Sequence, residues 1–253
     1  MTKSRGSSKT SIAAAVMLML VAACSGGGRS EEVVVSAAAS LAGAFGEIEA
    51  AFERTRPGVE VVLNVGGSSA LREQILEGAP VDVFAPADRS NMEGVVGAGL
   101  VVGSPRPFAV NELVIAVPPG NPAGVTGLDD FARAELLIGL CAEQVPCGSL
   151  ARQVLRSASV EPMVDTNEPD VRALLTKVEG GELDAGLVYL TDVASAAGSV
   201  DGVAIPGQFN VTAEYPIAVL SNGSARTAAG LFVEFVLSEE GRRILMAYGF
   251  GTP

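Results

Sequence analysis

The amino-acid sequence predicts an α/β protein whose strands form parallel sheets. Short apolar runs typical of buried strands alternate along the chain with segments whose apolar residues recur every three or four positions, as on one face of a helix. Several strand-like runs end in small residues and a serine, and a helix-like pattern follows without an obvious loop. This alternation of strand and helix favours the α/β class.

The stretch VVVSAAASLAGAF, residues 33–45, is the first of these strand-to-helix transitions. The apolar positions that follow the small residues are four, three and four apart and form one helix face: Leu41, Phe45, Ile48 and Phe52. Ser40 is therefore predicted to lie at the helix N-cap. There its hydroxyl either satisfies the first free backbone N–H groups or turns outward and leaves those donors for an incoming anion.

The remaining elements follow at the same rhythm. Further strands are predicted at 59–65, 81–85, 113–117, 136–140, 185–189 and 215–220. Further helices are predicted from Leu71 onward, within 86–99 and 166–182, and at 149–155, 191–197, 224–237 and 239–247. Pro169 is expected at the first helical position of its segment, where a helix accepts proline.

The first 30 residues are predicted to lie outside the fold. Basic residues precede an apolar stretch at 12–23 that is too short to span a bilayer. This stretch ends in LVAAC, which is similar to a bacterial lipobox, so we predict a signal peptide over 1–23 and lipidation of Cys24. The glycine-rich residues 24–30 then form a flexible tether. The alternative is a simple secretory signal cut at an Ala-x-Ala-like site, and either reading predicts export.

The composition narrows the function further. The 223 residues after the tether suffice for one large domain or two small lobes, and 48% of the residues are hydrophobic. With 17 basic and 29 acidic residues the net charge is −12, and it is near −16 without the first 30 residues, which hold four of the basic ones. Nucleic acid is therefore excluded as a partner. The chain has no histidine, which removes the commonest general base and the commonest metal ligand.

Cys141 and Cys147 remain once Cys24 is assigned to lipid. They have five residues between them in GLCAEQVPCGS, and in an exported protein this arrangement favours a disulfide that closes the loop. Two buried free thiols or a redox pair are the alternatives, and the spacing is not the C-x-x-C of redox motifs.

Four predicted helix or loop starts carry small residues that let a ligand approach the backbone. They are SAAAS at Ser40, GGSS at Ser68, VPCG at Cys147 and EPDV at Val171. In open α/β sheets ligands bind at such strand ends, and each helix start offers N–H donors. Tyr189 adds a hydroxyl at the end of a strand. Each signal has a structural alternative, because serines ordinarily cap helices, GGSS can form a turn and a terminal tyrosine can pack with its hydroxyl in water.

Together, longer motifs resemble the periplasmic molybdate-binding protein of ABC importers. They are SAAASL, GGSSALREQILEGAPVDVFAPAD, NELVIAVP, VPCG, EPDVRALLTKVEGGELDAGLVYLTDV and the terminal YGF. The match covers nearly all of residues 32–250, in the order of the family.

The resemblance implies a type II periplasmic-binding-protein fold, in which two α/β lobes are joined by a hinge that the chain crosses twice. Lobe 1 is expected to comprise residues 31–111 and 214–253, and lobe 2 residues 112–213. The crossings are expected near Asn111 and Glu214.

The resemblance also implies a ligand set for one tetrahedral molybdate or tungstate dianion, with no protein group bound directly to the metal. Lobe 1 is expected to supply the hydroxyl and N–H of Ser40 and of Ser68. Lobe 2 is expected to supply the backbone N–H of Cys147 and of Val171 and the phenol of Tyr189. Family members often have alanine at the position of Cys147. Because the N–H is the implied contact, the cysteine should preserve binding.

The expected function is extracytoplasmic capture of molybdate, with tungstate accepted, and delivery to an ABC permease by a lipid-anchored monomer without a cofactor. Another oxyanion such as sulfate or phosphate is the alternative ligand. An enzyme with Cys147 or Ser40 as nucleophile is a second class, but it lacks a histidine base. A sensory module on the same fold is a third, because a fold alone does not fix function.

Overall fold

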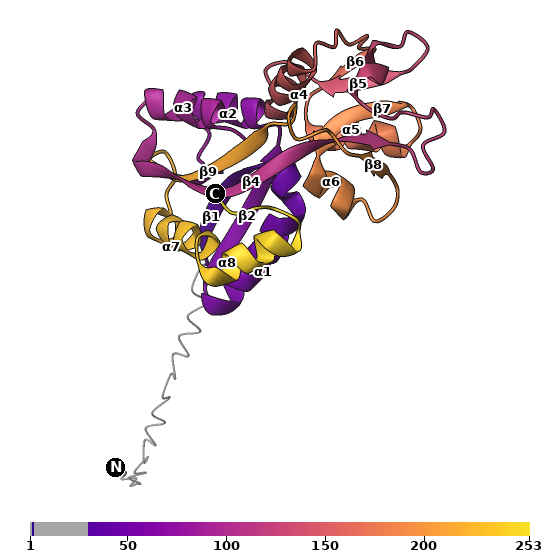
Figure 1. Cartoon of the computed structure of the whole chain (residues 1–253). Coiled ribbons are helices and arrows are strands. Elements are labelled where there is room, and N and C mark those ends of the chain that lie inside the picture. The colour runs from indigo at the N-terminus through magenta and orange to yellow at the C-terminus, as the bar shows by residue number, and fades with distance from the viewer. Residues whose placement is uncertain (1, 3–29) are drawn as a thin grey trace.

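The computed structural model describes residues 2 and 30–253 (Figure 1). Cys24, the tether up to residue 29 and the signal peptide apart from residue 2 lie outside the described residues. Within residues 30–253 the strands are β1 (Glu31–Ala38), β2 (Val59–Gly66), β3 (Val83–Ala85), β4 (Val101–Val117), β5 (Ile138–Cys141), β6 (Thr166–Glu168), β7 (Ala185–Tyr189), β8 (Asp201–Val203) and β9 (Thr212–Leu220).

These strands form one sheet in the order β2-β1-β3-β9-β4-β7-β5-β6, with β8 paired to β4. β1 pairs in parallel with β2 and β3, and β5 pairs in parallel with β6 and β7. All pairs made by β4 and β9 are antiparallel. The α/β class is therefore confirmed, but the expectation of purely parallel sheets is wrong. An apolar run predicts a strand without giving its direction, so the sequence pattern did not distinguish the two cases.

The strand β4 passes through the middle of the molecule. Its residues 101–112 pair with β9, and its residues 113–117 pair with β7 and β8. The sequence predicted a strand only over the apolar run 113–117, whereas β4 also includes prolines at 105 and 107. The structure accommodates them at irregularities in the register between β4 and β9. The predicted lobe boundaries fall where β4 and β9 pair, and the division into two lobes stays a prediction.

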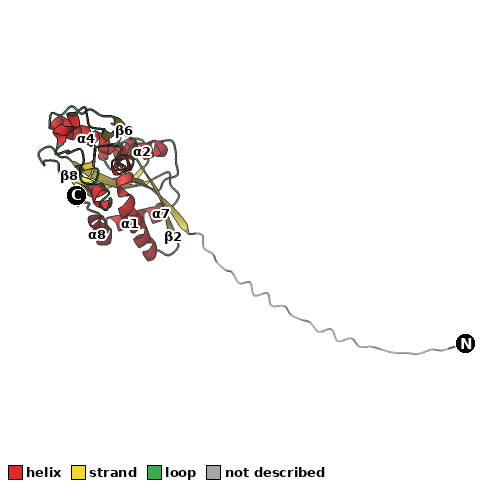
Figure 2. Cartoon of the chain, turned by 90° about the vertical axis from the view of Figure 1, so that its right-hand side faces the viewer, coloured by secondary structure: helices red, strands yellow, loops and turns green. Residues whose placement is uncertain are grey.

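The α-helices of the described chain are α1 (Ala42–Thr55), α2 (Ser68–Leu76), α3 (Arg89–Gly97), α4 (Pro146–Ser157), α5 (Val171–Glu179), α6 (Leu190–Ser195), α7 (Arg226–Val236) and α8 (Glu239–Ala247). Two 3₁₀ helices, η1 (Ala39–Leu41) and η2 (Leu128–Ala132), complete the list. The first part of the sheet consists of β1, β2, β3, β9 and residues 101–112 of β4, and the second part consists of β5–β8 and residues 113–117 of β4. Figure 1 shows α1, α7 and α8 on one face of the first part and α2 and α3 on the other. Figure 2 likewise shows α2 across the sheet from α1, α7 and α8. Helices α4, α5 and α6 surround the part built from β5–β8.

A row of buried aromatic rings connects the core to the region where the two parts of the sheet meet. Phe52 packs edge-on against Phe232 of α7, with 5.4 Å between ring centroids. The row continues through Phe45 and Phe108 to Tyr215 of β9, whose ring lies 5.9 Å from that of Tyr189. This packing fixes the end of β7 against β9. Among the described residues, no helix combines the length and the apolar character needed to cross a membrane.

Candidate anion-binding site

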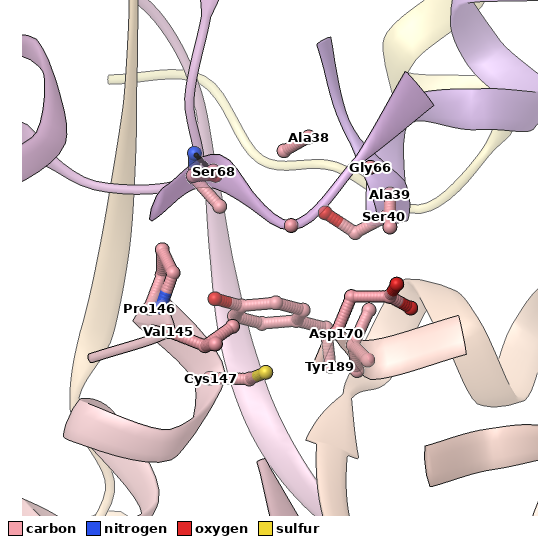
Figure 3. A pocket seen from close by; sticks show the side chains of 13 residues that line it. Ala38, Ala39, Ser40, Gly66, Ser68, Val145, Pro146, Cys147, Asp170 and Tyr189 are labelled. Carbon is pink, nitrogen blue, oxygen red and sulfur yellow. Dashed lines mark hydrogen bonds between the residues drawn. The ribbon is translucent and has the colours of Figure 1, made fainter. Parts of the chain in front are cut away.

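A small pocket lies between the two parts of the sheet, with about 200 Å³ of empty space. All five candidate residues from the sequence line it: Ser40, Ser68, Cys147, Val171 and Tyr189. Figure 3 shows Ser40 and Ser68 on one side and Cys147 and Tyr189 on the other. The pocket is small and its lining presents hydroxyl groups and helix starts, so it fits a small ion better than a large metabolite.

Ser40 does not lie at the N-cap that the sequence predicted. The chain first forms the 3₁₀ turn η1 after β1, and Ser40 is its second residue, whereas α1 begins only at Ala42. No side chain caps η1 or α1. The Ser40 hydroxyl instead lies 3.0 Å from the hydroxyl of Tyr215. Of the two alternatives for this serine, the structure thus excludes capping.

Ser68 is the first residue of α2, and Gly67 occupies the N-cap without a side chain to cap the helix. The Ser68 hydroxyl oxygen accepts a hydrogen bond from the backbone N–H of Ala87 at 3.0 Å. Because that bond uses a lone pair of the oxygen, the hydroxyl hydrogen remains available to an acceptor in the pocket. The side chain is buried, and because Ser68 begins a helix the alternative that GGSS is simply a turn is wrong.

Gly67 explains why this motif needs a glycine. A Cβ atom added there would lie 2.6 Å from the carbonyl oxygen of Pro169, which stands at the start of α5 on the opposite side of the pocket. Only a residue without a side chain lets the two sides approach this closely.

The first turn of α4 brings Cys147 to the pocket. Pro146 and Cys147 are its first two residues, and the N-cap residue Val145 has no capping side chain. The predicted disulfide between Cys141 and Cys147 is present and joins the end of β5 to this turn. Gly148 permits the tight packing, since an added Cβ would lie 2.0 Å from the carbonyl oxygen of Ala142.

The start of α5 differs from the prediction by two positions, because the helix begins at Val171. Asp170 is the N-cap, so Pro169 precedes the helix instead of beginning it. The Asp170 carboxylate accepts bonds from the N–H groups of Arg172 and Ala173, both at 2.9 Å. This cap does not bond the N–H of Val171, which is also in the first turn and stays available to a ligand. Asp170 also lines the pocket, and both of these bonds go to its Oδ1.

Tyr189 ends β7 and is only 1% exposed. Its hydroxyl has no hydrogen-bond partner among the described residues. Burial raises the pKa of Tyr189 well above the usual 10, so the hydroxyl keeps its proton and can donate. The alternative of a surface ring with its hydroxyl in water is therefore wrong. A buried hydroxyl without a partner is costly, and an anion in the pocket would supply the missing acceptor.

Sequence reasoning missed two polar residues behind the pocket, Tyr215 and Asn111. Both are buried, and they connect to Ser40 through the hydroxyl of Tyr215. Tyr215 is the first residue of one predicted strand, and Asn111 precedes another. The local sequence pattern does not indicate that either residue lies next to a site.

The arrangement suits a small anion. The first turns of η1, α2, α4 and α5 meet at one pocket, and free first-turn N–H groups carry a partial positive charge. Two serine hydroxyls and one phenol complete a set of neutral donors, and no lysine or arginine is among the lining residues. Within residues 30–253, no cluster of three His, Cys, Asp or Glu side chains is placed to hold a metal ion.

The α/β fold holds a small pocket, lined by hydrogen-bond donors, between the two parts of its sheet. This arrangement is typical of a solute-binding protein. The chain belongs to the family of bacterial extracellular solute-binding proteins, which it matches over residues 33–251. It is 40% identical over 215 residues to the molybdate-binding protein ModA of Mycobacterium tuberculosis, covering 85% of this chain and 82% of that one.

Two solved structures show the same fold. The periplasmic molybdate-binding protein of Azotobacter vinelandii superposes with a TM-score of 0.77 at 22% identity, over 87% of this chain and 99% of that one. The sulfate-binding protein SubI of Mycobacterium tuberculosis gives a TM-score of 0.78 at 18% identity, over 88% and 87%. The expected periplasmic-binding-protein fold is thus confirmed. Since proteins named for two different oxyanions share it, the fold alone does not identify the ligand.

Proposed function

We propose that this protein captures molybdate, and also tungstate, in the pocket between the two parts of the sheet and delivers it to an ABC importer. The observation that carries the proposal is the meeting of uncharged donors from both sides: Ser40 and Ser68 on one, Cys147, Val171 and Tyr189 on the other. The 40% identity to a protein named for molybdate binding supports the same ligand.

Binding by neutral donors follows from the needs of a buried dianion. All of its oxygen lone pairs must be satisfied once water is removed, and roughly seven N–H and O–H groups of these five residues replace its hydration shell. A hydrogen bond to a charged group contributes about 1.5–3 kcal/mol. A lysine or arginine would instead attract any anion without regard to its size.

Selectivity then comes from the size and protonation of the oxyanion. Molybdate and tungstate are nearly equal in size and charge, so one pocket accepts both. Sulfate is smaller and stretches the bonds to donors fixed on opposite sides. Protonated phosphate brings a hydrogen that none of the five proposed ligand residues is expected to accept, and the Asp170 carboxylate at the pocket already accepts two helix N–H bonds.

The protein is proposed to act outside the cytoplasm as a monomer, held to the membrane by lipid on Cys24, with the permease as its partner. It performs no chemistry on the ion and needs no resident cofactor. The family of extracellular solute-binding proteins, to which the chain belongs, supports this assignment over an enzyme.

Isothermal titration calorimetry of the protein without residues 1–30 tests the proposal. Molybdate, tungstate, sulfate and phosphate are each titrated at the same pH and ionic strength. Tight binding of molybdate and tungstate with weak or no binding of the other two is the expected result. Preference for sulfate or phosphate replaces the proposal by the alternative ligand, and heat from none of the four rejects an oxyanion function.

A further inference from the structure

We infer that Tyr215 is a positioning residue of the oxyanion site, which turns the Ser40 hydroxyl into a donor aimed at the bound ion. The inference rests on the proposed function. It concerns a residue outside the pocket, since Tyr215 is fully buried behind Ser40 and is not among the lining residues.

The hydroxyl groups of Ser40 and Tyr215 are in contact. The Ser40 Oγ and the Tyr215 hydroxyl oxygen are 3.0 Å apart, and on distance alone either can donate. If Ser40 donated to Tyr215, its hydrogen would be lost to the ligand. If Tyr215 donates, Ser40 accepts with a lone pair and keeps its hydrogen for the pocket.

The contacts of Asn111 favour the second arrangement. Its side-chain oxygen accepts the backbone N–H of Glu112 at 3.0 Å, so its amide nitrogen faces the other way. That nitrogen donates to the Thr191 hydroxyl at 2.8 Å and, at the longer distance of 3.5 Å, toward the Tyr215 hydroxyl oxygen. Because an amide NH₂ group only donates, the oxygen of Tyr215 accepts from Asn111, and the Tyr215 hydrogen stays free to point to Ser40.

The chain of donors therefore runs from Asn111 to Tyr215 to Ser40 and ends at the pocket. Burial raises the pKa of Tyr215, which keeps the phenol protonated at every physiological pH. All three residues behind Ser40 are almost fully buried, at 4% exposure for Asn111, 3% for Thr191 and 0% for Tyr215, so water does not compete for these bonds. A donor whose direction is fixed before binding needs no reorganisation when the ion arrives.

A double-mutant cycle with molybdate as the probe tests the inference. The four proteins are the wild type, Tyr215→Phe, Ser40→Ala and the double variant, each measured by calorimetry. In the presence of Ser40, Tyr215→Phe is expected to weaken molybdate binding about fivefold to tenfold, the size of one ordinary hydrogen bond. In the Ser40→Ala background the same change is expected to alter the Kd by less than about twofold, since the residue acts only through Ser40.

Two controls separate positioning from a structural role. Tyr248→Phe removes a phenol from a half-buried ring outside the pocket and is expected to leave the Kd unchanged. Asn111→Ala, measured in the same two backgrounds, removes the donor that orients Tyr215 and is expected to weaken binding only when Ser40 is present. Thermal unfolding without ligand confirms that each variant is folded.

Equal loss from Tyr215→Phe in both backgrounds overturns the inference, because a residue that merely supports the fold weakens binding whether or not Ser40 is present. No loss in either background overturns it as well. If the wild type binds none of the four oxyanions, the proposed function itself fails, and that result is distinct from additivity in a protein that binds molybdate.

Discussion

The buried hydroxyl of Tyr189 has the clearest individual role in the site. It bonds no described residue, and an unpaired buried hydroxyl costs about 1–3 kcal/mol in the empty protein. We expect Tyr189→Phe to leave the unfolding midpoint unchanged or slightly raised, because it removes that cost. Molybdate binding should weaken at least about tenfold, because a bond to a charged acceptor is lost. Calorimetry and thermal unfolding on the same samples measure both, with Ser40→Ala as a parallel variant, and unchanged affinity in both variants rejects the site.

A second residue-scale effect concerns Asp192, whose carboxylate accepts the backbone N–H of Tyr189 at 3.0 Å. Burial raises the pKa of Asp192 to about 7, although the Tyr189 N–H and the nearby charge of Arg172 oppose the rise. The folded protein thus holds this proton more tightly than the unfolded chain, in which the pKa is near 3.8. Its contribution to stability is complete below pH ~4 and is lost as the pH rises through 7.

We therefore expect the free energy of unfolding of the wild type to fall more steeply between pH 5 and pH 8 than that of Asp192→Asn. The asparagine oxygen can still accept the Tyr189 N–H, so the variant removes the titration and keeps the bond. Urea unfolding at four pH values across this range measures the difference. Parallel curves for the two proteins would show that Asp192 does not titrate there.

At the scale of the elements, sequence patterns predicted where strands give way to helices but not how the chain turns between them. The small residues of SAAAS and GGSS correctly marked two helix starts that line the pocket. These residues did not reveal that η1 precedes α1, because the same small and polar residue types occur in 3₁₀ turns and at N-caps. The helix α5 was predicted to begin two positions too early, at Pro169, because the pattern did not show that Asp170 caps the helix through two side-chain bonds.

Longer-range features were not predictable from local pattern. The contact of Ser40 with Tyr215 joins residues 175 positions apart, and no periodicity within either segment encodes it. The full length of β4 was hidden by its two prolines, which are tolerated only because the register with β9 is irregular there. The ligand set itself came from resemblance to a family, whereas the chemistry of helix starts alone predicted only an anion.

The disulfide between Cys141 and Cys147 connects the end of β5 to the first turn of α4. Because the proposed ligand contact at Cys147 is its backbone N–H, the double variant Cys141→Ala, Cys147→Ala is expected to bind molybdate within about threefold of the wild type. Its free energy of unfolding should fall by about 2 kcal/mol, the expected loss for opening so short a loop. Urea unfolding and calorimetry measure the two effects separately.

Gly148→Ala is the matched comparison in the same turn. Its Cβ would meet the Ala142 carbonyl oxygen at 2.0 Å, so the first turn of α4 must move and binding should be lost. If the cysteine variant remains folded but loses binding as well, the side chain or the cross-link contributes more than the N–H alone.

The whole molecule combines an acidic surface with an anion site. A net charge of −12 opposes the approach of a dianion at long range. Salt at physiological strength screens this repulsion beyond about 8 Å, whereas first-turn N–H groups act within the pocket itself. The donors must therefore be brought around the ion from both sides, and this requirement makes the relative position of the two parts of the sheet decisive for affinity.

The approach of Gly67 to Pro169 offers a test of that requirement. Because β4 is the strand that pairs with both parts of the sheet, we propose that the two parts close on the ion, which binds well only when both sets of donors surround it. Small-angle scattering is then expected to show a smaller radius of gyration for the wild type with molybdate than without it. In Gly67→Ala the added methyl group would lie 2.6 Å from the Pro169 carbonyl oxygen, so closure should be blocked.

For this variant we expect no compaction with molybdate and at least about a tenfold weaker Kd, since donors on only one side can reach the ion at full strength. Gly46→Ala is the matched control, because an added Cβ in that part of α1 meets no atom within 4 Å. It should compact and bind as the wild type does. Tight binding by Gly67→Ala, or a wild type whose radius of gyration does not change with molybdate, would show that the site is preformed and that closure plays no part in capture.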